Sequence, residues 1–236
     1  MKRVSLILLL AAVVAAAQRP REHQHSELSS STSAMSARSL DMGPHMKLTA
    51  VRQPSAEDQQ RAAEITERAR KAIEPYRDYR RALADGYHIF LPNVRQLMYH
   101  FTSYANAAEA AFGFHAERPT SLLYEKDGDG YRLIGVMYTA HRDASEEELN
   151  ARIPLSVTQW HAHVNICMPP RERRTEMFRR NARFGLRGSI ATESECREAG
   201  GRWVPQMFGW MVHAYPFESE PEKVWSLERQ ASGHRH

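Results

Sequence analysis

Two alternating histidines form the clearest chemical pattern in this chain. His161 and His163 stand two residues apart in the segment Trp160–Cys167. Residues two apart on a β-strand point to the same face, with Cβ atoms about 6–7 Å apart. Imidazole nitrogens bind transition metals at about 2.0–2.1 Å, so side chains with this spacing can share one ion. The segment predicts a strand with a polar face formed by His161, His163, Asn165 and Cys167, and an apolar face formed by Trp160, Ala162, Val164 and Ile166. A metal ion, a substrate pocket or solvent could each satisfy the polar face.

Two methionine–histidine pairs repeat this spacing. Met98 precedes His100 by two residues, and Met211 precedes His213 by two residues. Imidazole suits copper, zinc, iron or nickel, whereas a thioether is soft and favours Cu(I). The pairs therefore favour copper as the bound ion, with zinc second. Methionine is also a common filler of apolar cores, and this alternative stays open for both.

The remaining histidines and one glutamate are weaker candidates. His141 follows an expected strand and is a fifth possible ligand. Glu109 lies among alanines and could be a ligand, a general base or a surface residue of a helix. Surface positions are expected for His88 and His115, and solvated terminal segments are expected to contain His23, His25, His45, His234 and His236.

The chain has two cysteines, Cys167 and Cys196. In an oxidising compartment they predict one disulfide, which would stabilise the fold by about 3 kcal/mol. Alternatively, the Cys167 thiolate could join His161 and His163 as a copper ligand, although the order of residues does not match the cupredoxin pattern.

Patterns of several enzyme classes are absent from the sequence. It contains no Gly-x-Ser-x-Gly elbow, Walker loop, dinucleotide fingerprint or His-Glu-x-x-His helix. The His-x-His pair also lacks the following glutamate that the cupin pattern requires. Catalytic residues therefore cannot be assigned from sequence.

The N-terminus predicts export. Lys2 and Arg3 precede the apolar stretch 4–17, and Ala15–Ala17 fits the small-x-small pattern of signal peptidase sites. Fourteen apolar residues are too few for a permanent helix across a bilayer core of about 30 Å. A signal peptide at 1–17 and a periplasmic or extracellular protein without an integral membrane segment are expected.

Composition then divides the remaining chain. The serine-rich stretch 18–54 predicts a disordered linker, 55–228 a single globular domain, and 229–236 a flexible tail. The formal charge of +4 is too small to indicate a nucleic-acid partner. Arginines concentrate in 171–187, where they could bind an anionic partner or form a solvated helix face with Glu172 and Glu176.

An amphipathic helix and a sheet must position these side chains. Ser55 begins a helix whose apolar residues recur at steps of three and four, Pro75 should divide it, and Gly86 ends it. Its stripe comprises Ile65, Ala69, Ala72, Ile73, Tyr76, Tyr79 and Leu83. Strands are expected at 96–103, 121–125, 131–139, 159–167 and 207–215. We therefore expect an α+β fold with an N-terminal amphipathic helix packed on a mostly antiparallel sheet of about five strands.

Residues 76–168 resemble a group of uncharacterised exported bacterial proteins. The resemblance rests on Ala84–Tyr87, Met98–Phe101, Arg118–Pro119, Leu122–Glu125, Leu133–Tyr138 and Trp160–His163. Tyr99 replaces the glycine, and Met137 the glutamate, that are usual in the group. The resemblance implies export and a histidine site, and it transfers no activity.

Three functions remain open from the sequence. The first is an exported metal-binding protein with His161, His163, His213 and His100 as ligands and Met98 or Met211 as soft ligands. The second is a metal-dependent enzyme with an open coordination position, in a cleft lined by Tyr99, Trp160, Trp210 or Tyr215. The third is a metal-free module that binds a small molecule or another protein.

Overall fold

The computed structural model describes residues 43–234. The predicted signal peptide, most of the predicted linker, and His23, His25 and His236 lie outside the described residues. The described chain belongs to one compact unit, and it combines helices with a single sheet, which confirms the α+β class.

The sheet has seven strands in the order β1-β6-β7-β5-β4-β3-β2, and every neighbouring pair is antiparallel. The strands are β1 (Met46–Leu48), β2 (His88–Ile89), β3 (Tyr99–Thr102), β4 (Ser121–Asp127), β5 (Gly130–Ala140), β6 (His161–Met168) and β7 (Arg202–Ala214). A tight turn joins β4 to β5, and Gly128 adopts a positive φ of 53° there. This hairpin joins the two strands that the sequence predicted at 121–125 and 131–139.

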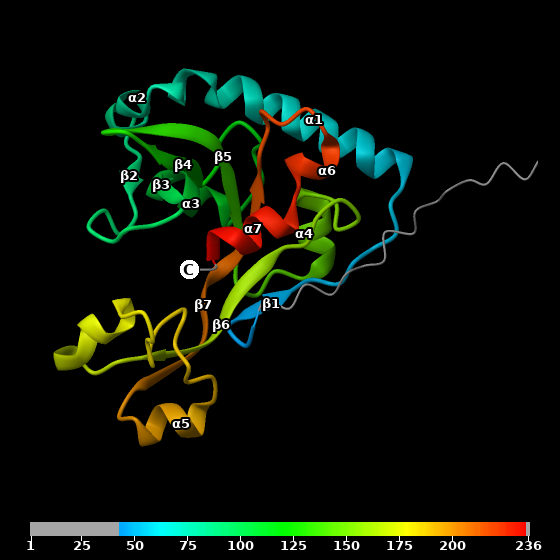
Figure 1. Ribbon diagram of the computed structural model, residues 1–236. Coiled ribbons are helices and arrows are strands. Elements are labelled where there is room, and N and C mark those ends of the chain that lie inside the picture. The colour runs from blue at the N-terminus through cyan, green and yellow to red at the C-terminus, as the bar shows by residue number, and fades with distance from the viewer. Residues whose placement is uncertain (1–42, 235–236) are drawn as a thin grey trace, which may run out of the picture. The chain divides into compact units, whose positions relative to one another are not determined.

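The helices are short except for the first. They are α1 (Ala56–Ile73), α2 (Tyr79–Ala84), α3 (Tyr104–Ala110), α4 (Glu146–Arg152), α5 (Glu193–Glu198), α6 (Pro221–Val224) and α7 (Leu227–His234), with 3-10 segments η1 (Glu74–Arg77) and η2 (Arg171–Phe178). Ser55 caps α1 by accepting a hydrogen bond from the Asp58 N–H, at 3.1 Å. Pro75 lies in η1, where the helical path divides as expected. Figure 1 shows α1 running across one side of the sheet.

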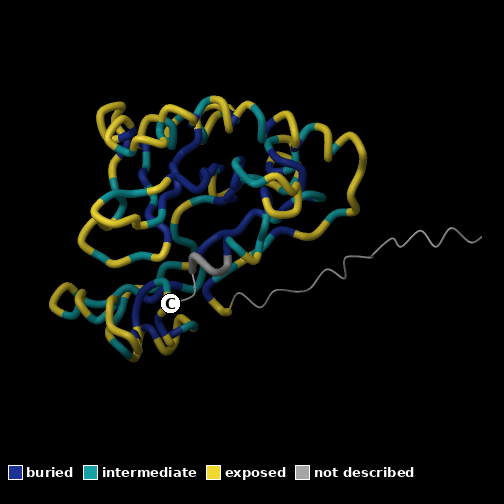
Figure 2. Tube along the Cα trace, turned by 45° about the horizontal axis from the view of Figure 1, so that its top comes forward, coloured by how far each residue is buried: buried dark blue, intermediate teal, exposed yellow. Residues whose placement is uncertain are grey.

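The two faces of the sheet bury different side chains. One face packs against the buried stripe of α1 in a large apolar core, which includes Trp160, Leu122 and Val212. Leu83 was expected in that stripe, but it is exposed and Ala82 is buried instead. The opposite face buries a smaller group that we call the methionine cluster: Met98, Leu123, Ile134, Met137, Met211 and Tyr215. Figure 2 shows the buried strands enclosed by exposed turns.

The start of the ordered chain differs from the sequence expectation. The linker was expected to reach residue 54, yet β1 pairs with β6 along the edge of the sheet. His45 is buried beside it, and its Nε2 lies 2.6 Å from the carbonyl oxygen of Gly188. The amphipathic helix is therefore not the first element. The sheet also has more strands than the expected five, because β1 and β2 are too short to show a periodicity in the sequence and were not predicted.

The C-terminal tail also differs. Residues 229–236 were expected to be flexible, whereas α7 extends to His234. Gln230 is fully buried, and its Oε1 accepts a hydrogen bond from the backbone N–H of His213 at 3.2 Å. Its amide nitrogen lies 3.4 Å from Thr158 Oγ1. His213 lies beyond the first residue of β6, so the side chain of Gln230 takes the place of a β6 partner for the backbone of β7 there. Hydropathy does not reveal this tertiary role.

Residues 169–201 form a small lobe at the far end of β6 and β7 (Figure 1). A disulfide joins Cys167 to Cys196, with Cα atoms 5.5 Å apart, and both cysteines pack with Phe184 and Ile190. The expected disulfide is confirmed, and it excludes Cys167 as a thiolate ligand. The arginine-rich segment begins in η2, where Arg173 forms an ion pair with Glu176 at 2.7 Å.

Within residues 43–234, no helix has the length and apolar character that crossing a membrane requires.

The disulfide is expected to contribute measurably to stability. Replacing both cysteines in a Cys167→Ala, Cys196→Ala variant should lower the free energy of unfolding by about 3 kcal/mol, because the unfolded chain loses a closed loop. Urea denaturation monitored by circular dichroism measures this loss. An unchanged midpoint would show that the lobe does not depend on the bridge.

Candidate metal centre

Three strands carry the four predicted histidine ligands. His161 and His163 lie on β6, His213 lies on β7, and His100 lies on β3. His161 and His213 are fully buried, His163 is 6% exposed, and His100 is half-buried. The histidines of β6 and β7 therefore belong to the interior, and His100 lies nearer the solvent.

The imidazole rings of these residues contact one another in series. The ring centres of His100 and His213 are 5.5 Å apart, and those of His161 and His213 are 5.2 Å apart. The ring centre of His163 lies 5.9 Å from that of His161. His213 thus contacts a neighbour on each side, and residues more than a hundred positions apart meet.

The rings form a row and do not surround a single point. Among residues 43–234, no three side chains of the types His, Cys, Asp and Glu are placed to hold one metal ion. Pairs of histidines are nevertheless suitably spaced. Two imidazoles that bind one tetrahedral ion at about 2.0–2.1 Å have ring centres about 5 Å apart. The pairs formed by His213 with His161 and with His100 match this spacing.

The methionines predicted as soft ligands lie beside this row. Met98 and Met211 are both buried in the methionine cluster. The hydroxyl of Tyr215 lies 3.9 Å from the sulfur of Met98, close enough to donate a weak hydrogen bond. Burial raises the pKa of the Tyr215 hydroxyl, against the opposing charge of Arg229, so the phenol keeps its proton at neutral pH.

Strand register places methionines opposite the histidines, and three of them, Met137, Met207 and Met46, were not assigned as ligands from the sequence. Met137 on β5 stands directly across from His213, and Met211 on β7 stands directly across from His161. His163 has Met207 across from it on one side and Met46 on the other. Directly opposed residues of an antiparallel pair have Cβ atoms about 4.5–5.5 Å apart. Met137 is far along the chain from every histidine of the row, so no local spacing could have indicated it as a ligand.

Gly135 keeps the middle of this face open. It lies on β5, across from Leu123 on β4, and Leu123 is in turn across from His100. A Cβ atom on Gly135 would overlap the carbonyl oxygen of Ala214 and lie 2.9 Å from Cδ1 of Tyr215. Since β4 and β5 lie between β3 and β7, the contact of His100 with His213 spans two strands, and the absence of a side chain at Gly135 leaves room on this face.

An irregularity in β7 shapes one end of the row. The pairing of β6 with β7 shifts between His161 and His163, and Phe208 has a positive φ of 65°. The ring of Phe208 lies 6.4 Å from that of His163 and 6.1 Å from that of Phe90. Phe208 is nevertheless 48% exposed. The bulge therefore directs an aromatic side chain toward the solvent edge beside His163.

Three other histidines of the described chain lie outside the row: His88, His115 and His141. His141 has a largely exposed side chain and an ion-pair geometry with Asp143, at 3.6 Å. His88 stacks on the exposed ring of Tyr104, with ring centres 5.8 Å apart. His115 is exposed, as expected. The structure thus does not bring His141 to the other four candidates.

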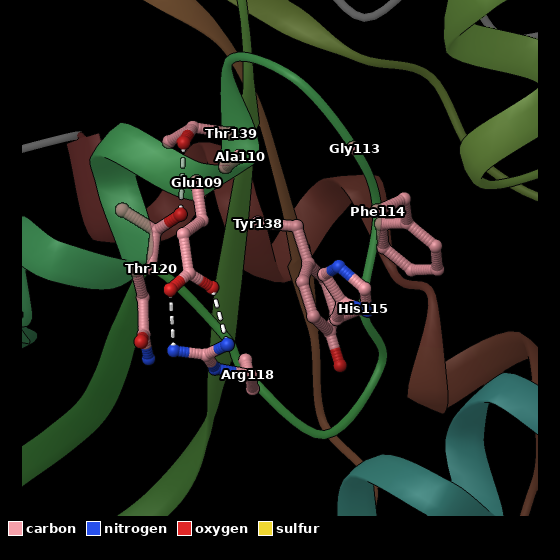
Figure 3. Close-up of a pocket in the computed structure, with 10 residues that line it drawn as sticks. Glu109, Ala110, Gly113, Phe114, His115, Arg118, Thr120, Tyr138 and Thr139 are labelled. Carbon is pink, nitrogen blue, oxygen red and sulfur yellow. Dashed lines mark hydrogen bonds and ion pairs between the residues drawn. The ribbon is translucent and has the colours of Figure 1, made fainter.

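Glu109 belongs to a small cavity beside α3, shown in Figure 3. Its carboxylate pairs with Arg118, and Thr120 and Thr139 share a hydrogen bond of 2.8 Å behind it. The cavity, of about 10 Å³, has room for about one water molecule. Glu109 is thus a partly exposed ion-pair partner, which agrees with a surface role.

The aromatic residues expected around a catalytic cleft divide between the two faces. Tyr99, Trp160 and Trp210 pack in the large core on the α1 side of the sheet. Tyr215 alone of these four belongs to the methionine cluster. Three of the residues proposed for a substrate cleft therefore form part of the structural core.

Comparisons with known proteins supply no relative: no protein-family model, curated protein or solved structure matches this chain.

Gly135 provides a test of how tightly the histidine face is packed. Gly135→Ala should lower the free energy of unfolding by about 1–3 kcal/mol, because the new methyl group overlaps β7. Gly113→Ala is the matched control, since its nearest atom would be 3.7 Å away. Chemical denaturation of both variants measures the difference. Equal stability of the two variants would contradict the packing described for β5 and β7.

Proposed function

We propose that this protein is exported and binds a transition-metal ion, copper in preference to zinc, on the histidine-bearing face of its sheet. The observation that carries the proposal is the meeting of imidazoles from β3, β6 and β7. His213 is central, because its ring centre lies 5.2 Å from that of His161 and 5.5 Å from that of His100.

Burial of these rings supports a binding role. His161 and His213 are fully buried next to apolar and thioether side chains. A bound ion would supply strong bonds to the ring nitrogens, and the half-buried His100 would face the route by which the ion enters.

Export is supported by separate features. The apolar stretch 4–17 with its preceding positive charges is typical of a signal peptide. The disulfide between Cys167 and Cys196 is typical of proteins that fold in an oxidising compartment.

A metal-free function is the second candidate. The rings of His161 and His213 are nearly perpendicular, with an interplanar angle of 89°, and those of His161 and His163 are perpendicular at 90°. Edge-to-face packing of this kind suits rings that stabilise a core by contacting one another. In this alternative the histidine row is a structural element of an interaction module.

Metal binding distinguishes the two candidates. The protein purified from its export compartment should retain or rebind copper, measured by elemental analysis after removal of free metal. Copper at 100 times its Kd should stabilise the fold by about 2.7 kcal/mol, and a chelator should reverse this gain. A folded protein that neither binds copper or zinc nor gains stability from them would contradict the proposal.

Variants locate the binding. His213→Ala should abolish copper binding, because His213 is shared by both ring pairs, and His100→Ala should weaken it with less effect on folding. His141→Ala is the control, since that side chain is largely exposed. Circular dichroism must show that each variant is folded. Copper affinity that depends on His141 and not on His213 would place the site elsewhere.

A further inference from the structure

The histidines of β6 and β7 share their face with methionines in an ordered way. His213 is opposite Met137, and His161 is opposite Met211. Both methionines are buried, with exposures of 8% and 6%, and both belong to the methionine cluster. Each buried histidine of this pair therefore has a thioether as its directly opposed neighbour.

These four side chains can reach a common ion. The rings of His161 and His213 are 5.2 Å apart, which matches two imidazoles on one tetrahedral centre. Met211 lies on the same strand as His213, two residues before it, so both side chains point to the same face. Met137 flanks His213 from the neighbouring strand. Rotation about the flexible methionine side chains can then bring two sulfur atoms to the ion.

We infer that the site binds reduced copper, Cu(I), through two imidazoles and two thioethers, with His161, His213, Met137 and Met211 as the ligands. This inference rests on the proposed function and specifies its ion. Thioether sulfur is a soft donor that favours Cu(I), whereas zinc is held by imidazole, thiolate and carboxylate. Met137 is the new assignment, and it acts as a specificity-determining ligand.

The charge of the surroundings supports a monovalent ion. The side chains of the methionine cluster are thioethers, aliphatic groups and one phenol, with no carboxylate among them, and histidine binds metals as neutral imidazole. The cost of desolvating an ion grows with the square of its charge. A buried set of neutral ligands therefore favours Cu(I) over Cu(II) or Zn(II).

Met98 differs from the other two methionines of the cluster. Its sulfur lies within weak hydrogen-bonding distance of the Tyr215 hydroxyl, at 3.9 Å, and Tyr215 is covered by Arg229 at 4.0 Å. One of the two lone pairs of this sulfur accepts the hydrogen bond, which makes the sulfur a weaker donor to a metal ion. The inference therefore assigns Met98 to packing, and Met137 and Met211 to the ion.

Competition for Cu(I) tests the assignment. Under anaerobic conditions, the full mature chain competes with a chromophoric Cu(I) chelator, and Ag(I) serves as a redox-inert substitute. Mutation of a residue that only supports a metal ligand typically lowers metal affinity by about 10–100-fold. Loss of a ligand in Met137→Leu or Met211→Leu should therefore lower the Cu(I) affinity by at least about tenfold. Zn(II) affinity should change little, because thioethers contribute little to zinc.

Two controls use the same substitution. The first is Met177→Leu, because Met177 packs near Phe184 in the lobe. The second is Met98→Leu, because Met98 belongs to the methionine cluster but is not a proposed ligand. Neither variant removes a proposed ligand, so neither should change the Cu(I) affinity by more than about twofold. X-ray absorption at the copper edge should show both sulfur and nitrogen bound to the ion in the parent protein.

The outcomes separate the inference from the proposed function. Copper binding that is lost in His213→Ala but unchanged in Met137→Leu and Met211→Leu would overturn the thioether assignment and leave the histidine site intact. A preference for Zn(II) over Cu(I) would overturn the inference in the same way. A parent protein that binds no metal at all would overturn both.

Discussion

Burial of imidazoles on one face of the sheet is the constraint around which this structure is arranged. His161 and His213 are removed from water completely, and each must be surrounded by groups that tolerate a polar ring. Neighbouring rings, thioethers and a phenol surround them. These groups are polarizable or weakly polar, so they accommodate nitrogen atoms better than a purely aliphatic core would.

The other face of the sheet supplies the stability that makes this arrangement possible. The α1 side buries a continuous apolar core with several aromatic rings, including Phe101, Tyr124 and Trp160. Apolar burial is the largest favourable contribution to folding. The strands are therefore held in register by one face, while the opposite face keeps histidine and methionine side chains whose chemistry suits the proposed metal binding. Such a division fits a scaffold that holds its ligands rigidly.

Local features adapt the sheet to its polar face. Gly135 and Gly209 allow backbone approaches that a Cβ would block, and the positive φ at Phe208 marks a bulge next to His163. Gln230 closes the free edge of β7 at His213. Each of these residues acts on the geometry of the histidine row, and none would be selected by searching for metal ligands.

Much of the fold followed from short-range patterns. The Ser55 cap, the apolar stripe of α1, the β4–β5 hairpin and the five longer strands depend on contacts within a few residues, so periodicity predicts them. The edge strands β1 and β2 and the helix α7 were missed. Their residues are ordered by partners far away in sequence, such as β6 for β1 and the β7 edge for Gln230.

The sequence by itself determined which side chains of a strand share a face, because alternation is a property of the extended backbone. It therefore identified His161 with His163, Met98 with His100 and Met211 with His213. The tertiary structure alone decided that His100 meets His213, and that Met137 on β5 faces His213 on the neighbouring strand β7. Strand order and register produce these contacts, and they depend on the packing of the whole chain, which no local spacing encodes.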